Sequence, residues 1–265
     1  MAIAGLAGAT TARADGQVAS ELRTKTSNEI GLTVSSYEYK EPSISMSLKA
    51  TKVGIDYNAA IALSNDWFVR GDLSFATGKT DYSSPASGTK NGNTDWNYEL
   101  RGLVGNDFDN GTYVLSPYLG LGFQHLFNDI RGATSTGAIG YRRESRYTYL
   151  PLGVTHRLRL ESAARLSTTL EYDHFLDGQQ KTFGSDVSAL YPDVTNNQRA
   201  GYGIRGSIYY EKNSWSFGPW FRYWNINQSD STPATVTLLG VTYNATIIEP
   251  QNTTTEVGLR FGYKF

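Results

Sequence analysis

The sequence predicts an all-β fold in which about ten antiparallel strands close into an up-and-down barrel that crosses a membrane. Two observations lead to this prediction. Apolar and polar residues alternate with a period of two in one segment after another, as in strands with one apolar and one polar face. The connections between these segments alternate between short and long along the 265 residues. Eight and twelve strands are the alternatives.

The composition agrees with such a barrel and excludes several other classes of protein. No apolar run approaches the roughly 18 residues that a membrane helix needs. Hydrophobic residues make up 39% of the chain, which suits a barrel because only every second strand residue meets lipid. The chain has no Cys, which excludes disulfides, thiolate metal sites and cysteine nucleophiles. A net charge of −1 gives no electrostatic case for nucleic acid as a partner.

The strands are read from the alternating apolar and aromatic residues. In chain order they cover residues 29–34, 53–63, 67–75, 96–104, 113–123, 150–158, 164–172, 202–210, 215–223 and 257–265. Ahead of the second strand, Ile44, Met46 and Leu48 alternate on the opposite parity. We therefore expect a β-bulge near residues 49–52.

The connections predict how the barrel lies in its membrane. Residues 64–66, 105–111, 159–162 and 211–214 form short turns, and residues 79–94, 128–141, 174–198 and 227–252 form long polar loops. Barrels of bacterial outer membranes have short periplasmic turns and long external loops, so we expect both termini on the periplasmic side. The apolar run near residues 236–248 can instead form a hairpin beyond the membrane.

The last strand carries a resemblance to a known superfamily. Apolar or aromatic residues occupy positions 257, 259, 261, 263 and 265. This segment resembles the closing strand of bacterial outer-membrane β-barrels, and Pro117-Tyr-Leu-Gly-Leu-Gly-Phe123 is similar to a strand of small porin-like and opacity-type barrels. The resemblance implies an outer-membrane location in a Gram-negative bacterium, with lipid including lipopolysaccharide and the barrel-insertion machinery as partners. It also implies that Phe261, Tyr263 and Phe265 form the assembly signal.

The beginning of the chain suggests a secretory leader. Residues 2–14 are small and largely apolar, and Ala12-Arg-Ala14 forms an A-x-A pattern before Asp15. We read residues 1–14 as a residual signal peptide and residues 15–265 as the barrel domain. An ordinary N-terminal segment is the alternative.

The polar parity of the strands identifies candidate lumen-lining residues. They are Asp56, Arg70, Asp72, Glu99, Arg101, Arg157, Glu171, Asp173, Arg205, Trp220, Arg222, Trp224 and Arg260. These charges of both signs can form an ion-pair network that fills the interior, or they can line a narrow pore. Trp220 and Trp224 on either side of Arg222 suggest cation–π stacking, which could bind a sugar or aromatic ligand or act as a bulky plug.

An enzyme is the least favoured function. Omptin proteases are ten-stranded barrels with an Asp/His dyad, and Glu171-Tyr-Asp-His174 lies near the corresponding height. Asp173 and His174 are adjacent, however, so they point to opposite faces, and the second Asp pair is missing because Asp81 and Asp95 stand alone. Three scattered His make no metal site. We therefore expect no enzyme, cofactor or metal.

The sequence leaves two functions open. The first is porin-like passage of ions or small solutes through the lumen. The second is a non-conducting, adhesin-like surface barrel whose loops at 174–198 and 227–252 bind extracellular partners, since function concentrates on exposed loops.

Overall fold

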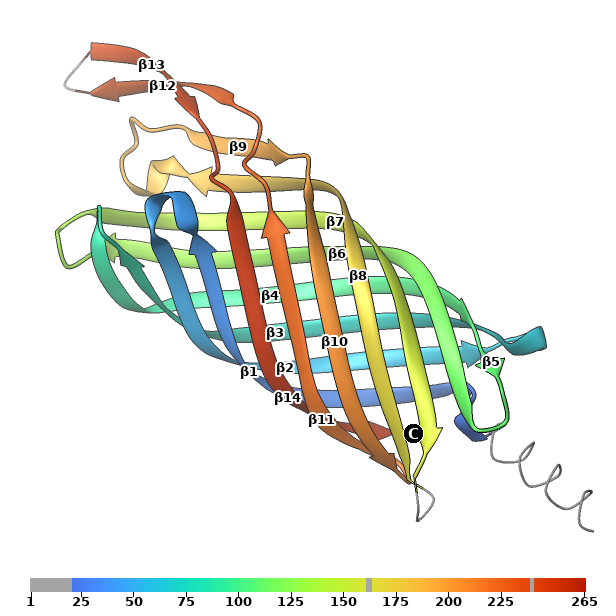
Figure 1. Ribbon diagram of the computed structural model, residues 1–265. Helices are drawn as coiled ribbons and strands as arrows, with labels where there is room; N and C mark the ends of the chain where they lie inside the picture. Colours follow the sequence, from blue (N-terminus) through green and yellow to red (C-terminus); the bar gives the residue numbers. More distant parts are fainter. Residues whose placement is uncertain (1–20, 161–163, 239–240) are drawn as a thin grey trace, which may run out of the picture.

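Ten strands follow one another around a closed ring, each antiparallel to both neighbours (Figure 1). The structure is a computed structural model that describes residues 21–160, 164–238 and 241–265. The expected signal peptide at residues 1–14 lies outside the described residues. In ring order the strands are β1 (Ser27–Glu41), β2 (Met46–Ala62), β3 (Trp67–Ser84), β4 (Gly88–Asn106), β6 (Tyr113–Ala133), β7 (Ile139–Arg159), β8 (Arg165–Phe183), β10 (Gly201–Lys212), β11 (Trp215–Ile226) and β14 (Asn252–Lys264).

Pairing between the first and last strands closes the ring. β1 and β14 stay in register from Glu29↔Lys264 to Lys40↔Thr253. The backbones of Asn28 and Phe265 then exchange hydrogen bonds of 3.0 and 2.8 Å. Closure removes the free edges that lipid does not tolerate, because lipid cannot pair with backbone N–H and C=O groups. The predicted ten-stranded antiparallel barrel is confirmed.

The outer surface carries an apolar belt next to the short turns. Along β1 and β2 the outward residues Ile30, Leu32, Val34, Val53 and Ile55 are all exposed, and equivalent positions on the other strands continue the belt. Aromatic side chains border it at both heights, as at the interfaces of a membrane. Trp96 packs against Tyr98, His125 and Phe127 at the upper border, and Trp215 packs against Phe261 and Tyr263 at the lower border. Such a surface requires lipid, so the barrel spans a membrane.

Most strands continue far beyond this belt. β6 and β7 have 21 residues each, about twice what a membrane strand needs. The expected loops at 79–94 and 128–141 are therefore wrong, and so is most of the one at 174–198, because β8 continues to Phe183 and residues 193–198 form a further strand. β3 and β4 are joined by residues 85–87, and β6 and β7 by residues 134–138. Outside lipid the outward residues need not be apolar, so the alternation disappears from the sequence although the pairing continues.

The expected bulge at residues 49–52 is also wrong. β1 and β2 pair without interruption from Ser27↔Ala60 to Glu41↔Met46. Met46 and Leu48 consequently face the interior together with Lys52. The parity of the apolar residues changes because Met46 and Leu48 join an apolar cluster inside the barrel at this height and do not face lipid. Register shifts occur instead on β3–β4, β6–β7 and β7–β8.

Short strands and 3-10 helices lie at the two ends of the barrel. β5 (Phe108–Asp109) pairs with β6, and β9 (Asp193–Gln198) extends the sheet beside β8. Single-turn 3-10 helices occupy Pro42–Ile44, Ser64–Asp66 and Gly184–Asp186. In the described part of the chain, no helix is long and apolar enough to cross a membrane.

The segment at residues 227–252 contains a hairpin that stands apart from the barrel. β12 (Thr232–Leu238) and β13 (Val241–Ile247) form a separate two-stranded sheet. It projects from the end opposite the C-terminus, beyond β9 (Figure 1). The hairpin that we expected as the alternative to a loop here is therefore confirmed.

Two arginine substitutions on β14 test the position of the apolar belt. Leu259 points outward within the belt, and Thr253 points outward beyond it beside Lys40. We expect Leu259→Arg to destabilise the barrel in lipid by about 2–4 kcal/mol, because a cation near the bilayer centre loses its hydration. Thr253→Arg should change the free energy of unfolding by about 0–1 kcal/mol. Unfolding in vesicles by urea measures both, and equal losses would contradict this placement.

Candidate functional site in the barrel lumen

Ion pairs cross the middle of the lumen from one wall to the other. β4 and β11 lie five places apart in the ring of ten, so they face each other across the barrel. Arg222 on β11 reaches Glu99 on β4 at 3.5 Å and Glu256 on β14 at 2.6 Å. Arg205 on β10 joins the same Glu99 at 2.6 Å. These contacts bridge the lumen from one wall to the other at this height.

The bridging pairs belong to a larger cluster, which we name the central ion network. Its members are Glu99, Arg101, Glu171, Asp173, Arg205, Arg222 and Glu256, and all are buried or nearly so. Arg205 also contacts Asp173 at 2.5 Å and Glu171 at 3.3 Å. Tyr118 donates a hydrogen bond of 2.6 Å to Glu171. Buried charges need such partners because they have lost their hydration.

An aromatic layer lies directly against this network. Tyr149 donates a hydrogen bond of 2.5 Å to Glu99, and its ring lies 5.1 Å from that of Trp224. Tyr147, Phe175 and Ile226 complete the layer. A Cβ atom at position 122 would lie 2.2 Å from the Tyr149 ring, so Gly122 is what allows this aromatic side chain to lie flat on the wall. The layer packs directly above the charges, on the side away from the short turns.

Farther from the apolar belt, a second layer fills the barrel from the opposite wall. Tyr37, Tyr39, Met46, Leu48 and Ile130 pack together. They come from β1, β2 and β6, so the contacts again reach across the lumen. This layer explains why apolar residues on β2 face inward at this height.

A pair of carboxylates covers the distal end of the barrel. Glu41 ends β1, and Glu249 comes from the link between β13 and β14. Arg143 on β7 contacts both, with 2.7 Å to Glu41, and the Tyr39 hydroxyl lies within hydrogen-bond distance of both, 2.9 Å from Glu41 and 3.1 Å from Glu249. Burial, reinforced by the neighbouring Glu41, raises the pKa of Glu249 to about 7 although Arg143 opposes this.

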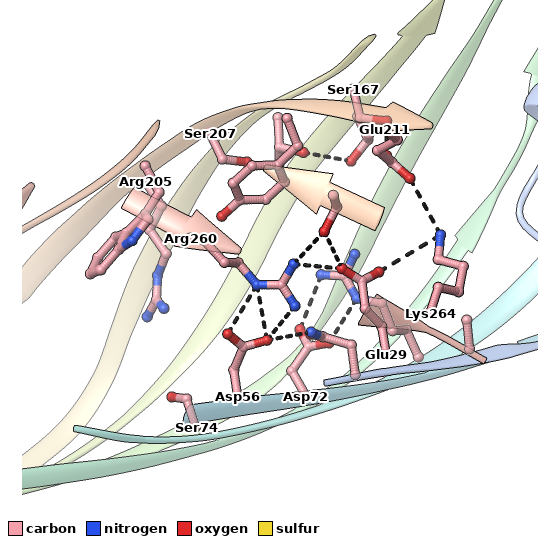
Figure 2. A pocket seen from close by; sticks show the side chains of 18 of the residues that line it. Glu29, Asp56, Asp72, Ser74, Ser167, Arg205, Ser207, Glu211, Arg260 and Lys264 are labelled. Atoms are coloured by element: carbon pink, nitrogen blue, oxygen red, sulfur yellow. Dashed lines mark hydrogen bonds and ion pairs between the residues drawn. The ribbon is translucent and has the colours of Figure 1, made fainter. Parts of the chain in front are cut away.

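A cavity of about 690 Å³ occupies the half of the lumen near the short turns (Figure 2). Arg260 lies between Asp56 and Glu29 on its wall, with Nε 2.9 Å from Asp56, and Lys264 is 3.4 Å from Glu211. The charges on the wall therefore largely neutralise one another. The whole lining contains 11 Lys or Arg and 8 Asp or Glu, a formal excess of three positive charges, so the arrangement suits water or a small polar or anionic molecule.

The first described residues line the cavity on the side of the short turns. Leu22 is 2% exposed and lines the cavity together with Arg23 and Thr24. Arg23 forms an ion pair of 3.1 Å with Asp109, and Thr24 donates a hydrogen bond of 3.2 Å to Asp107. These contacts tie residues 21–24, which we name the N-terminal cap, to the turn between β4 and β6.

Comparison with solved structures identifies the fold. No protein-family model matches the chain, and no curated protein matches it. The outer-membrane protease OmpT from Escherichia coli superposes with a TM-score of 0.53 at 11% identity, over 90% of this chain and 96% of OmpT. This chain has the fold of a bacterial outer-membrane β-barrel.

Other similar structures are also domains of this kind. The transport unit of the autotransporter AIDA-I from E. coli has a TM-score of 0.44 at 11% identity, over 97% of this chain and 98% of that one. The translocator domain of the autotransporter NalP from Neisseria meningitidis has a TM-score of 0.42 at 10% identity, over 97% and 96%.

The barrel places the candidate lumen residues at two heights. Asp56, Arg70, Asp72, Glu99, Arg101, Arg157, Glu171, Arg205, Trp220, Arg222 and Arg260 line the cavity. Asp173 and Trp224 are buried above it. The expected stacking of Trp220 and Trp224 on Arg222 does not form. Trp224 belongs to the aromatic layer, where Arg205 lies 5.8 Å from its ring.

The residues considered for a protease are not brought together. Asp173 is fully buried beside Arg205, whereas its neighbour His174 lies exposed on the outer face near Tyr172. Asp95 is buried in an ion pair of 2.5 Å with Lys52, and Asp81 is exposed on the outside of β3. Among the described residues, no group of three or more His, Asp or Glu could hold a metal ion.

Sequence reasoning missed the residues of the distal half. Tyr37, Tyr39, Lys52, Tyr147 and Tyr149 are inward and buried, but their segments read as loops or as strand ends. Continuing the inward parity of each strand beyond the apolar belt would have found them. Glu249 carries no such signal, because it lies in a link between strands.

A change at the centre of the network tests its contribution to stability. Glu99→Gln removes the charge that faces Arg205 and Arg222, so we expect a loss of about 3–5 kcal/mol in the free energy of unfolding. The matched control is Glu144→Gln, whose ion pair with Arg146 lies at the surface. The control should lose about 0–1 kcal/mol. Denaturant titration of both variants in vesicles measures these losses. Equal changes in the free energy of unfolding would contradict a stabilising network.

The carboxylate pair predicts a dependence on pH. Because folding raises the pKa of Glu249 above its ordinary value near 4.5, its contribution to stability is present below that value and is lost as the pH rises through about 7. We expect the hydrogen bonds between Ser229 and Glu249 to open more often at pH 8 than at pH 5. Hydrogen-exchange protection factors for these amides measure this. Glu249→Gln should remove the difference, and equal protection at both pH values in the unmodified protein would refute it.

Proposed function

We propose that this chain is a closed, non-conducting barrel of the bacterial outer membrane that acts through its membrane-distal surface. One observation carries the proposal, namely the bridging of opposite walls by Arg222, Arg205 and Glu99. The aromatic layer, the apolar layer around Met46 and the carboxylate pair add three more barriers in series along the same lumen. A pore would require all of them to move.

The orientation that we propose puts the short turns and both described ends of the chain in the periplasm. The apolar belt begins beside the short turns, so the distal halves of the strands and the β12–β13 hairpin lie outside the cell. Assembly would use Phe261, Tyr263 and Phe265, which point outward and are exposed at the lower border of the belt. Lipid including lipopolysaccharide and the barrel-insertion machinery are the proposed partners.

A porin-like function fits this interior less well. The cavity beside the short turns is large enough for a small solute. It ends at the central ion network, however, and the N-terminal cap lies across its other end. We interpret it as a hydrated space that the side chains of a ten-stranded barrel do not fill completely.

Proteolysis is not part of the proposal. OmpT supports the fold alone at 11% identity. Asp173 and His174 point to opposite sides of β8, so they cannot act on the same substrate atom. We propose that the chain is not an enzyme.

Electrical recording tests the closed lumen. We expect purified protein in a planar bilayer to show no stepwise conductance, because four barriers lie across the barrel. Insertion must be established independently by resistance of the reconstituted barrel to protease, and an open porin in the same bilayer serves as the positive control. Stable conductance steps from the folded protein would overturn the proposal in favour of the porin-like function.

A further inference from the structure

The β12–β13 hairpin has two edges that pair with no other strand of the described chain. β12 and β13 pair with each other over seven residues, from Thr232↔Ile247 to Leu238↔Val241. Each strand therefore presents a row of N–H and C=O groups on its other side. Isolated two-stranded hairpins are marginal in water, and a free edge is a template for an additional strand.

The hairpin also lacks the charges that usually protect such edges. Residues 231–248 include no Asp, Glu, Lys, Arg or His, whereas Asp230 and Glu249 stand immediately on either side. Val241 and Tyr243 are each 52% exposed, and Thr242 and Asn244 between them are exposed as well. Charged edge residues prevent pairing between copies of a protein. No charged side chain in residues 231–248 would repel a second copy.

The base of the hairpin is fixed to the barrel. Asn196 on β9 donates hydrogen bonds of 3.0 Å to Thr232 and 2.8 Å to the carbonyl of Ile247. Glu249 is held by Arg143 and Tyr39 directly after β13. The edges are thus held in an extended form before any partner arrives, which lowers the entropy cost of pairing.

The two edges are not equivalent. β12 begins beside β9, where Thr232 donates a hydrogen bond of 3.2 Å to the carbonyl of Thr195. Pro233 also lacks an N–H group, and proline in a strand directs that missing donor to the unpaired edge. On β13 the carbonyl of Ile247 accepts a hydrogen bond from Asn196, but no residue lacks an N–H group, so this edge is the better surface for pairing.

We propose that the β13 edge pairs with the β13 edge of a second copy of this protein, in antiparallel register about a two-fold axis at Asn244. This rests on the proposed function, in which the distal surface is the working part of the barrel. The register places alike or compatible side chains opposite one another. The pairs are Val241 with Ile247, Thr242 with Thr246, Tyr243 with Ala245, and Asn244 with its own copy.

The antiparallel arrangement requires the two copies to face each other. A two-fold axis across the strands reverses the strand direction, whereas an axis along the strands would make them parallel. The hairpin extends away from the barrel at the distal end (Figure 1). Two barrels in opposed membranes therefore present their hairpins head to head. The pairing connects one outer membrane with another.

A single contact of this size is weak, and this sets the form of the test. Two seven-residue strands bury far less than the roughly 1,200 Å² of a stable interface. Many copies in each membrane act together, however, and multivalency strengthens the attachment by about 10² or more. The effect should therefore appear between membranes and not between isolated molecules.

The experiment measures clustering of lipid vesicles that carry the full barrel. Asn244→Lys and Asn244→Asp each place like charges opposite one another across the two-fold axis. At low salt, where the Debye length is about 30 Å, we expect vesicles with the unmodified protein to cluster by light scattering. Vesicles with either variant alone should scatter like protein-free vesicles. A mixture of Lys vesicles with Asp vesicles should cluster again.

The control is Thr136→Lys, which adds the same charge to an exposed turn at the same end of the barrel. It should leave clustering unchanged. The pairing is overturned if unmodified vesicles do not cluster, if Asn244→Lys vesicles cluster as well as unmodified ones, or if the mixture fails to recover. A barrel that is electrically silent but does not cluster vesicles overturns only this pairing and leaves the closed lumen standing.

Discussion

The width of a ten-stranded ring determines which side chains can meet inside this barrel. Its lumen is narrow enough for side chains on opposite walls to meet, as Glu99 on β4 and Arg222 on β11 do. Once they meet, each buried charge must find a partner of opposite sign, because neither lipid nor bulk water is available to it. Arg205 consequently joins Glu99, Glu171 and Asp173, and Arg260 joins Glu29 and Asp56. The ion pairs that cross the lumen follow from this requirement.

The second constraint is that the same strand passes through different surroundings along its length. Within the apolar belt β2 points Val53 and Ile55 outward and Asp56 inward. Beyond the belt it points Lys49 outward and Leu48 inward, without any change in pairing. The barrel is therefore apolar outside and polar inside in the membrane, whereas farther out its interior combines apolar clusters with buried polar side chains. The buried apolar cluster around Met46 lies where the outer face no longer meets the apolar belt.

This change of surroundings explains how much of the structure could be predicted from the sequence. Ten strands, their antiparallel order and the inward charges follow from alternation, because lipid imposes apolar residues at every second position. The lengths of β3, β4, β6 and β7 did not follow, because polar strand residues outside the membrane resemble loop residues. Which inward side chains contact one another could not be predicted either. Arg222 contacts Glu99 and Glu256 and does not stack between Trp220 and Trp224, and only the closure of the ring determines which strands face one another.

The seam between β1 and β14 has a consequence for how the barrel is made. Glu29 and Arg260, which form an ion pair beside it, are 231 positions apart in the chain. β1 is therefore synthesised long before β14, which is its second neighbour in the ring. Until β14 is made, one edge of β1 has a complete row of unpaired backbone groups. Contacts of such long range form slowly, and an open strand edge invites aggregation in the meantime. The newly made chain must therefore be prevented from aggregating with other copies until β14 pairs with β1.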